Sequence, residues 1–167
     1  MQTGYRNLRR WPFATILSAR KYGCDNIFAK RGAELGSKLC MAILRGDNME
    51  TDKLLDAGAP LDFRDEPDGW TPLIYGIYYR NQRACQWLLD HGADPEQSDF
   101  SGRTPLMVAA IVDDVPLVKR LLEMNVAPEK PDCHGQTAFD FARKFHNREC
   151  ASLLWDALHR KGAVYER

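Results

Sequence analysis

The chain of 167 residues lacks most of the signals that assign a protein to a chemical class. No apolar run approaches the ~18 residues that a membrane helix needs, and no secretory signal is visible. Neither sign of charge is in excess, because 23 basic residues balance 23 acidic ones. This balance argues against broad capture of nucleic acid, which requires a basic surface. We therefore expect a globular protein with neither a transmembrane segment nor a nucleic-acid partner.

The motifs of the common enzyme and cofactor classes are also missing. There is no G-x-x-x-x-G-K-S/T phosphate loop, no G-x-G-x-x-G turn, no H-E-x-x-H zinc helix and no G-x-S-x-G nucleophile turn. Asp90-His91-Gly92 looks like a catalytic fragment when read alone, but no nucleophile stands beside it. Histidine followed by glycine is typical of a helix end. We expect no enzyme activity, no catalytic residues and no cofactor.

Cysteine is present, but without the pairing that a disulfide framework needs. The residues are odd in number and scattered, at Cys24, Cys40, Cys85, Cys133 and Cys150. This pattern indicates reduced thiols, and we expect an intracellular, cytoplasmic protein. A zinc site is the metal alternative, built from Cys133, His134, His146 and Cys150. Their spacing is unlike paired C-x-x-C ligands, so we expect no metal.

Acidic residues are absent from segment 1–24. The basic residues of this segment are Arg6, Arg9, Arg10, Arg20 and Lys21, and apolar residues recur in it at helical spacing. An Arg-rich start without acids is compatible with a mitochondrial presequence, which makes mitochondria the alternative location. The simpler interpretation is a basic arm, or a helix docked on the rest of the chain, which is net negative by the same five charges.

A repeated pattern with a period of 33 is what the chain does contain. GWTPLIYG (69–76) returns one period later as GRTPLMVA (102–109), and a weaker copy begins at Gly135. Paired large apolar residues keep the same step at 88–89, 121–122 and 154–155. The segment 38–59 fits the template at a step of 34, which we attribute to one extra loop residue at Glu66 or Pro67. Self-similarity at a fixed period predicts stacked units.

A period of 33 with T-P-L, a small residue, a leucine pair and Gly-Ala resembles the ankyrin-repeat family, from about Ser37 to Leu158. The resemblance implies an all-α solenoid of helix-turn-helix units joined by β-turn or finger loops. We expect an ankyrin-repeat domain over 37–167, with repeats near 37–67, 68–100, 101–133 and 134–160. Residues 1–36 are expected to form a basic arm and one or two capping helices, beginning at Asp25, that cover the first repeat.

Most of the repeated letters have a physical role in a helix pair. Thr71 and Thr104 can cap a helix N-terminus through their hydroxyls, and a proline after each suits the first helical position. Ser37 and Thr137 stand at the same place in the first and fourth units. A small residue then lets the partner helix cross closely, and this position is filled by Ala42, Gly76, Ala109 and Ala142.

The second helix of each unit has a stop signal, except in the last unit. Gly58, Gly92 and Asn125 can adopt the left-handed conformation that ends a helix. Leu158 stands there in the fourth unit, so we expect the last helix to continue toward Arg160.

Two positions depart from the family's pattern. The usual glycine between the two helices of a unit survives at Gly46, and its replacements are Arg80, Asp113 and His146. Each replacement that keeps a positive φ should cost about 1 kcal/mol. The usual histidine after T-P-L is replaced by Cys40, Ile74, Met107 and Asp140.

The concave face of such a stack, made of loop tips and the outer side of each first helix, is the expected site of a partner. Nine residues on it are aromatic, aliphatic or basic, and we call them the concave strip: Trp70, Tyr78, Tyr79, Phe100, Arg103, Ile111, Val112, Lys144 and Phe145. Trp, Tyr and Arg dominate interface hot spots, and neighbouring exposed apolar side chains mark interaction patches. The strip predicts a protein partner.

Two functions stay open at this point. The first is a non-enzymatic adaptor that binds another protein through the concave strip. The second is a permanent accessory subunit of a large, mitochondrial complex, anchored by the basic N-terminal arm, since permanent interfaces are more hydrophobic than transient ones. A third possibility is internal, with the arm and its Trp11 and Phe13 folded back over the strip. Family membership supplies a scaffold and not the identity of a ligand.

Overall fold

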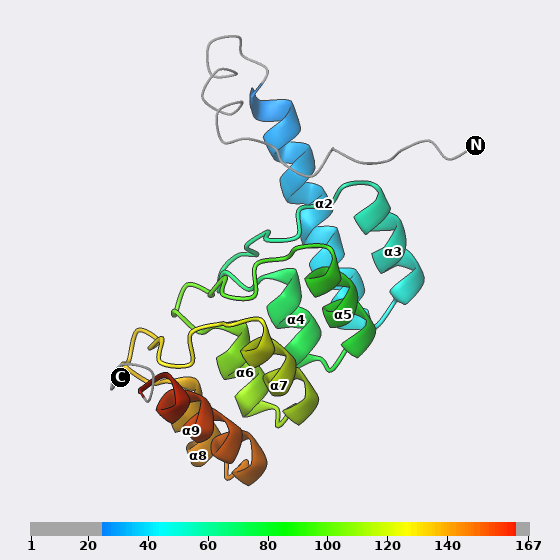
Figure 1. Cartoon of the computed structure of the whole chain (residues 1–167). Helices are drawn as coiled ribbons and strands as arrows, with labels where there is room; N and C mark the ends of the chain where they lie inside the picture. Colours follow the sequence, from blue (N-terminus) through cyan, green and yellow to red (C-terminus); the bar gives the residue numbers. More distant parts are fainter. Residues whose placement is uncertain (1–24, 163–167) are drawn as a thin grey trace, which may run out of the picture.

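The computed structural model describes residues 25–162, and the basic segment 1–24, with its presequence or arm, lies outside the described residues. Throughout the described part the regular secondary structure is α-helical (Figure 1). The helices are α2 (Asp25–Arg45), α3 (Asn48–Asp56), α4 (Pro72–Tyr78), α5 (Gln82–Asp90), α6 (Pro105–Ile111), α7 (Val115–Glu123), α8 (Ala138–Lys144) and α9 (Arg148–Gly162). Within residues 25–162, no helix combines the length and the apolar composition that crossing a bilayer requires.

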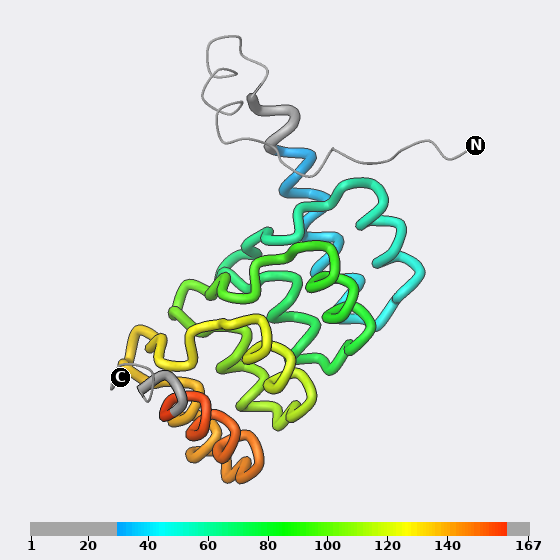
Figure 2. Tube along the Cα trace, viewed as in Figure 1, coloured from blue at the N-terminus to red at the C-terminus, as the bar shows by residue number. Residues whose placement is uncertain are grey.

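The helices pack as consecutive pairs, α2 with α3, α4 with α5, α6 with α7 and α8 with α9. Each pair stacks on the next, and the backbone trace winds along the stack once per pair (Figure 2). We call α2, α4, α6 and α8 the inner helices and the others the outer helices. Neighbouring inner helices pack more closely than neighbouring outer helices, so the inner row is the concave side. The expected all-α solenoid is confirmed.

Threonine caps begin the short inner helices, as the repeated T-P-L predicts. The hydroxyl of Thr71 accepts a hydrogen bond from the Ile74 amide at 3.2 Å, and that of Thr104 from Met107 at 3.3 Å. Thr137 caps α8 in the same way. Caps of this kind contribute about 1 kcal/mol each. The aspartates and asparagine that cap three outer helices were not predicted: Asp47, Asn81 and Asp114.

The expected helix start at Ser37 is wrong. Ser37 lies inside α2, which runs without a break from Asp25 to Arg45 and extends past the stack at its N-terminal end (Figure 1). No proline follows this serine, and the helix tolerates Gly32 and Gly36 in its interior. Gly36 has a packing reason, because a Cβ there would collide with the ring of Phe63. Close packing therefore offsets the ~1 kcal/mol that a helical glycine costs.

The backbone turns follow the expected left-handed pattern. Between the two helices of each unit, φ is positive at Gly46 (69°), Arg80 (58°), Asp113 (57°) and His146 (61°). The predicted stops of the outer helices are also left-handed: Gly58, Gly92 and Asn125. The last helix has no such stop and continues to Gly162, as expected. Four of these turns, at Arg80, Asp113, Asn125 and His146, therefore hold a side chain in a region that costs about 1–2 kcal/mol for ordinary residues.

The core is a continuous column of apolar side chains between the two rows of helices. Leu88, Leu121 and Leu154 are fully buried one period apart. The small-residue position is buried as predicted, and a Cβ added at Gly76 would lie 2.8 Å from the sulfur of Cys85. Trp155, which replaces the second leucine in the last unit, is half exposed.

Candidate protein-binding surface

An aromatic cluster occupies the inner side of the second unit. We define it as Trp70, Tyr75, Tyr78 and Tyr79, all within α4 or directly beside it. The Trp70 ring centroid lies 5.0 Å from that of Tyr78 and 5.2 Å from that of Tyr75. Tyr79 stacks on Tyr75 at 6.2 Å. Tyr78 and Tyr79 remain 48% and 45% exposed, whereas Trp70 packs against the core. The structure thus brings three predicted strip residues together.

Tyr75 belongs to this cluster but was missed in the sequence. Its hydroxyl donates a hydrogen bond to Asp65 Oδ2 at 2.9 Å, which ties α4 to the preceding loop. Burial, and then this hydrogen bond, raises the pKa of Tyr75 well above its usual range. Its position four residues before Tyr79 was the available signal, because residues i and i+4 share a helix face. Tyr75 therefore acts as the fixed base on which Tyr79 rests.

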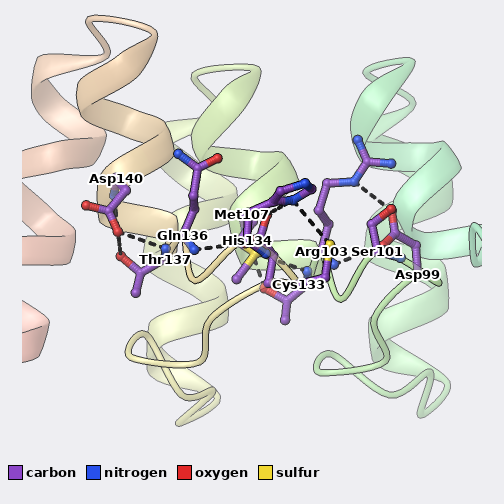
Figure 3. A network of polar contacts seen from close by, with 11 residues as sticks. Asp99, Ser101, Arg103, Met107, Cys133, His134, Gln136, Thr137 and Asp140 are labelled. Atoms are coloured by element: carbon purple, nitrogen blue, oxygen red, sulfur yellow. Dashed lines mark hydrogen bonds and ion pairs between the residues drawn. The ribbon is translucent and has the colours of Figure 1, made fainter.

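Arg103 sits beside Trp70 and is held by its own loop. Its Nε donates to Asp99 Oδ2 at 2.8 Å, and its guanidinium carbon lies 6.0 Å from the Trp70 ring centroid. The other oxygen of Asp99 accepts from the backbone amides of Ser101 and Arg103, each at 2.9 Å (Figure 3). Because Asp99 is buried, this geometry fixes the direction in which Arg103 points.

The next loop repeats the same turn one period later. Asp132 Oδ1 accepts from the amides of His134 and Gln136, at 2.9 and 2.8 Å (Figure 3). In both loops the turn is closed by a hydrogen bond from the aspartate amide to the carbonyl four residues later, Asp99 to Arg103 and Asp132 to Gln136. In the loop before α4 the Asp65 amide donates instead to the Trp70 carbonyl, five residues later. This difference confirms the extra residue expected at Glu66 or Pro67.

Phe100 extends the exposed apolar surface along the loop row. The Phe100 ring covers Gly69, where an added Cβ would collide with the ring. The guanidinium carbon of Arg64 lies 5.7 Å from the centroid of the same ring. The backbone amide of Phe100 donates to the Asp68 carbonyl at 3.0 Å, so adjacent loops are hydrogen-bonded to each other. With 53% of its surface exposed, Phe100 is presented on a rigid base.

The remaining strip residues lie at the C-terminal ends of α6 and α8. Ile111 and Val112 are half-buried and pack against the core. Lys144 and Phe145 are exposed at the equivalent place on α8. Arg80 donates a hydrogen bond to the Val112 carbonyl, which joins the second unit to the third. A separate pocket of about 450 Å³ lies at the turn between α8 and α9 and is lined by Ala142, Arg143, His146, Asn147, Arg148 and Ala151.

The residues considered for zinc are separated by their roles in the fold. Cys133 Sγ lies 3.2 Å from His134 Nδ1 on an exposed loop tip. Cys150 is buried and donates to Asp113 Oδ1 at 3.3 Å. In the part of the chain that the structure describes, no three His, Cys, Asp or Glu residues are grouped as a metal site would need. His91 follows α5 and stacks on Trp87, the helix-end role expected for it.

Paired helices stacked in register, with finger loops along one edge, define a repeat solenoid. Residues 88–142 match the family model described as ankyrin repeats (many copies), and residues 19–99 match that of ankyrin repeats (3 copies). The chain belongs to the ankyrin-repeat family. Met107 and Asp140 replace the family's usual histidine. Each accepts a hydrogen bond from the backbone amide of its threonine cap, a contact that was not predicted from the sequence.

Several curated proteins are similar to parts of this chain. Inversin from Gallus gallus is 36% identical over 123 residues, which is 74% of this chain and 11% of inversin. The human 2-5A-dependent ribonuclease is 33% identical over 89 residues, 53% of this chain and 12% of that protein. The human SH3 and multiple ankyrin repeat domains protein 2 is 42% identical over 85 residues, 50% of this chain and 4% of that protein.

The chain therefore spans about an eighth or less of the length of these relatives. What it shares with them is a run of ankyrin repeats, a type of domain that is typically non-catalytic. Ankyrin repeats bind other proteins, so the chain is a protein-interaction module.

Proposed function

We propose that this chain is a non-catalytic adaptor that holds a partner protein against the concave strip. The observation that carries the proposal is the pair Tyr78 and Tyr79, half exposed on an inner helix although ordinary solvent-facing positions are polar. Large aromatic side chains near the centre of a surface supply most of the binding energy of protein interfaces. Tyrosine also loses few rotamers when it is buried by a partner.

The strip is well suited to binding because its side chains are already positioned. Tyr79 rests on Tyr75, whose hydroxyl is bonded to Asp65, and Arg103 is held by Asp99. A partner would therefore not have to order these groups when it docks. Ordering costs about 0.5–1.5 kcal/mol per flexible side chain, so a preformed surface keeps more of its contact energy as affinity.

A permanent accessory subunit of a larger complex is the second candidate function. It is favoured by Phe100 and Phe145, whose rings are 53% and 48% exposed, because permanent interfaces are more apolar than transient ones. Mitochondrial location and anchoring by segment 1–24 belong to this candidate. The native mass of the endogenous protein separates the two, since an adaptor is partly free and a subunit is found only in its complex.

The first test compares two double variants, each of which replaces two exposed side chains by serine. Tyr78→Ser/Tyr79→Ser removes the exposed tyrosines from the concave side, and Met49→Ser/Met124→Ser removes exposed apolar residues from α3 and from the end of α7. We expect the first variant to weaken partner capture at least ~30-fold, as loss of hot-spot residues does, while the second captures normally. The measurement is quantitative mass spectrometry of proteins retained by each full-length variant.

Thermal melting of both variants is the control for folding. Equal melting temperatures with loss of partners from the tyrosine variant alone support the proposal. Equal capture by the wild type and the folded tyrosine variant would remove the concave strip as the interface.

A further inference from the structure

Ion pairs neutralise the basic residues of three outer helices, α3, α5 and α7. Every basic residue of α3, α5 and α7 is paired with a carboxylate: Lys53 with Glu50, Arg83 with Asp52, Arg120 with Asp90, and Lys119 with Glu149. Three of these four pairs join neighbouring units, across 30 or 31 residues of sequence. Along α3, α5 and α7 the cations of the convex side are therefore compensated, whereas Arg148 at the start of α9 is exposed and has no carboxylate partner among the described residues.

Acidic side chains are few on the inner helices, and in α2 Glu34 pairs with Lys38 of the same helix. Neither α4 nor α6 contains an acidic residue, and the one acid of α8, Asp140, is bound to its cap Thr137. Arg45, at the end of α2, and Lys144, at the end of α8, are exposed and form no ion pair with the residues that the structure describes. Arg80 is exposed as well, and the contact described for its guanidinium is a backbone carbonyl.

The helix dipole explains why cations stand at the C-terminal ends of these helices, but it does not explain why they lack a carboxylate partner. A positive charge near a helix C-terminus is stabilised by about 0.3–1 kcal/mol. The same preference acts on Arg120 in the last turn of α7, and there a carboxylate from the neighbouring unit completes the pair. For Arg45, Arg80 and Lys144 the described residues supply no such carboxylate. The ends of the inner helices thus carry three cations without a described carboxylate partner, although the chain as a whole is neutral.

Segment 1–24 does not suit this face electrostatically. It contains five basic residues and no acid, so docking it over Arg45, Arg80 and Lys144 would bring like charges together. Like-charge contacts disfavour an interface. Charge complementarity therefore favours an occupant from another molecule.

We propose that the concave strip takes an acidic segment of a partner protein, with carboxylates for Arg45, Arg80 and Lys144 and apolar side chains for the tyrosines. This rests on the proposed function and specifies its ligand. Arginine presents a planar fork that fits a carboxylate. Between the cations the half-exposed tyrosines Tyr78 and Tyr79 and the half-buried Ile111 and Val112 offer contacts to the apolar side chains of a protein segment.

The test selects random displayed peptides on the immobilised full-length chain and measures the affinity of the synthesised winners by fluorescence anisotropy. We expect winners with net negative charge and apolar residues, and binding that weakens as salt is raised. Arg45→Glu/Lys144→Glu should reduce their affinity about tenfold or more. Lys53→Glu/Arg83→Glu changes the net charge by the same amount on the outer helices, and it should leave the affinity within about twofold. Melting temperatures of both variants verify the fold.

The outcomes separate failure of the acidic-ligand proposal from failure of the concave interface. If Tyr78→Ser/Tyr79→Ser abolishes binding but Arg45→Glu/Lys144→Glu does not, the face is an interface and the acidic ligand is wrong. If neither variant affects binding, the proposed function fails as well. A single-stranded oligothymidylate is tested on the same proteins. If it binds, is weakened by the same charge reversal and competes with the peptides, the face recognises phosphates and the protein ligand is overturned.

Discussion

Three cysteines of the described residues, Cys40, Cys85 and Cys150, are single side chains inside the core of the stack. Burial is the main cause that raises the pKa of each of these thiols to about 12. Nearby carboxylates act in the same direction, such as Asp113 beside Cys150. Because the thiolate is the reactive form, these cysteines are protected both by packing and by their raised pKa, which leaves little thiolate. Cys133, on a loop tip, is exposed.

Thiol labelling at mildly alkaline pH tests this difference. In a Cys24→Ser variant, which removes the cysteine outside the described residues, we expect one thiol to react rapidly with Ellman's reagent. The three buried thiols should react on the order of 100-fold more slowly, because little thiolate forms and reagent access requires opening of the stack. In denaturant all four should react. Two or more rapid thiols in the native protein would show that the core is not closed as described.

The cap of α8 provides a prediction about pH. Asp140 accepts from the amide and the hydroxyl of Thr137 at 2.9 and 2.7 Å, and these hydrogen bonds lower the pKa of Asp140 below its usual 3.8. A carboxylate with a lowered pKa in the folded state stabilises the protein above 3.8 and loses that contribution as pH falls through the folded value.

We therefore expect Asp140→Asn to lower the free energy of unfolding by about 1 kcal/mol at neutral pH. The difference from the wild type should shrink toward zero as the pH falls through the lowered pKa of the wild-type carboxylate. Urea unfolding of both proteins over this range measures it. A difference that stays constant or grows as the pH falls would show that the charge of Asp140 is not what stabilises the cap.

At the scale of helices, the short inner helices could be predicted and the long first helix could not. A threonine, a proline and a left-handed turn are local signals, so the start and end of α4 and α6 follow from a few neighbouring letters. The continuity of α2 depends on Gly36 being packed by Phe63, which lies beyond the whole of α3 in the sequence. A contact at that separation has no local signature, and two glycines favoured a break.

The two glycines of α2 provide a matched test of this account. A Cβ at Gly32 would meet nothing within 4 Å, whereas one at Gly36 would collide with Phe63. We expect Gly32→Ala to stabilise the protein by about 0.5–1 kcal/mol, as alanine does inside a helix. Gly36→Ala should destabilise it by about 1–3 kcal/mol through overpacking. Urea unfolding measures both, and equal effects of the same sign would contradict the packing of α2.

At the scale of the whole molecule, the repeat period predicts the architecture but not the distribution of paired and unpaired charges over its two faces. A constant period predicts stacked helix pairs, and it places Tyr78, Ile111 and Lys144 at equivalent positions on successive inner helices. It does not show that cations on α5 and α7 find carboxylates on neighbouring outer helices while those on the inner row do not. Such pairing depends on side chains from different repeat units, so the balanced composition does not reveal which cations lack a partner.

Site-specific photo-crosslinking in the complex with a captured partner shows which face of the stack the partner touches. A benzophenone amino acid replaces Tyr78 on the concave side in one protein, and Met49, which is 73% exposed on α3, in another. The account predicts that the partner crosslinks efficiently through position 78 and not through position 49. Efficient crosslinking through position 49, with none through position 78, would contradict it.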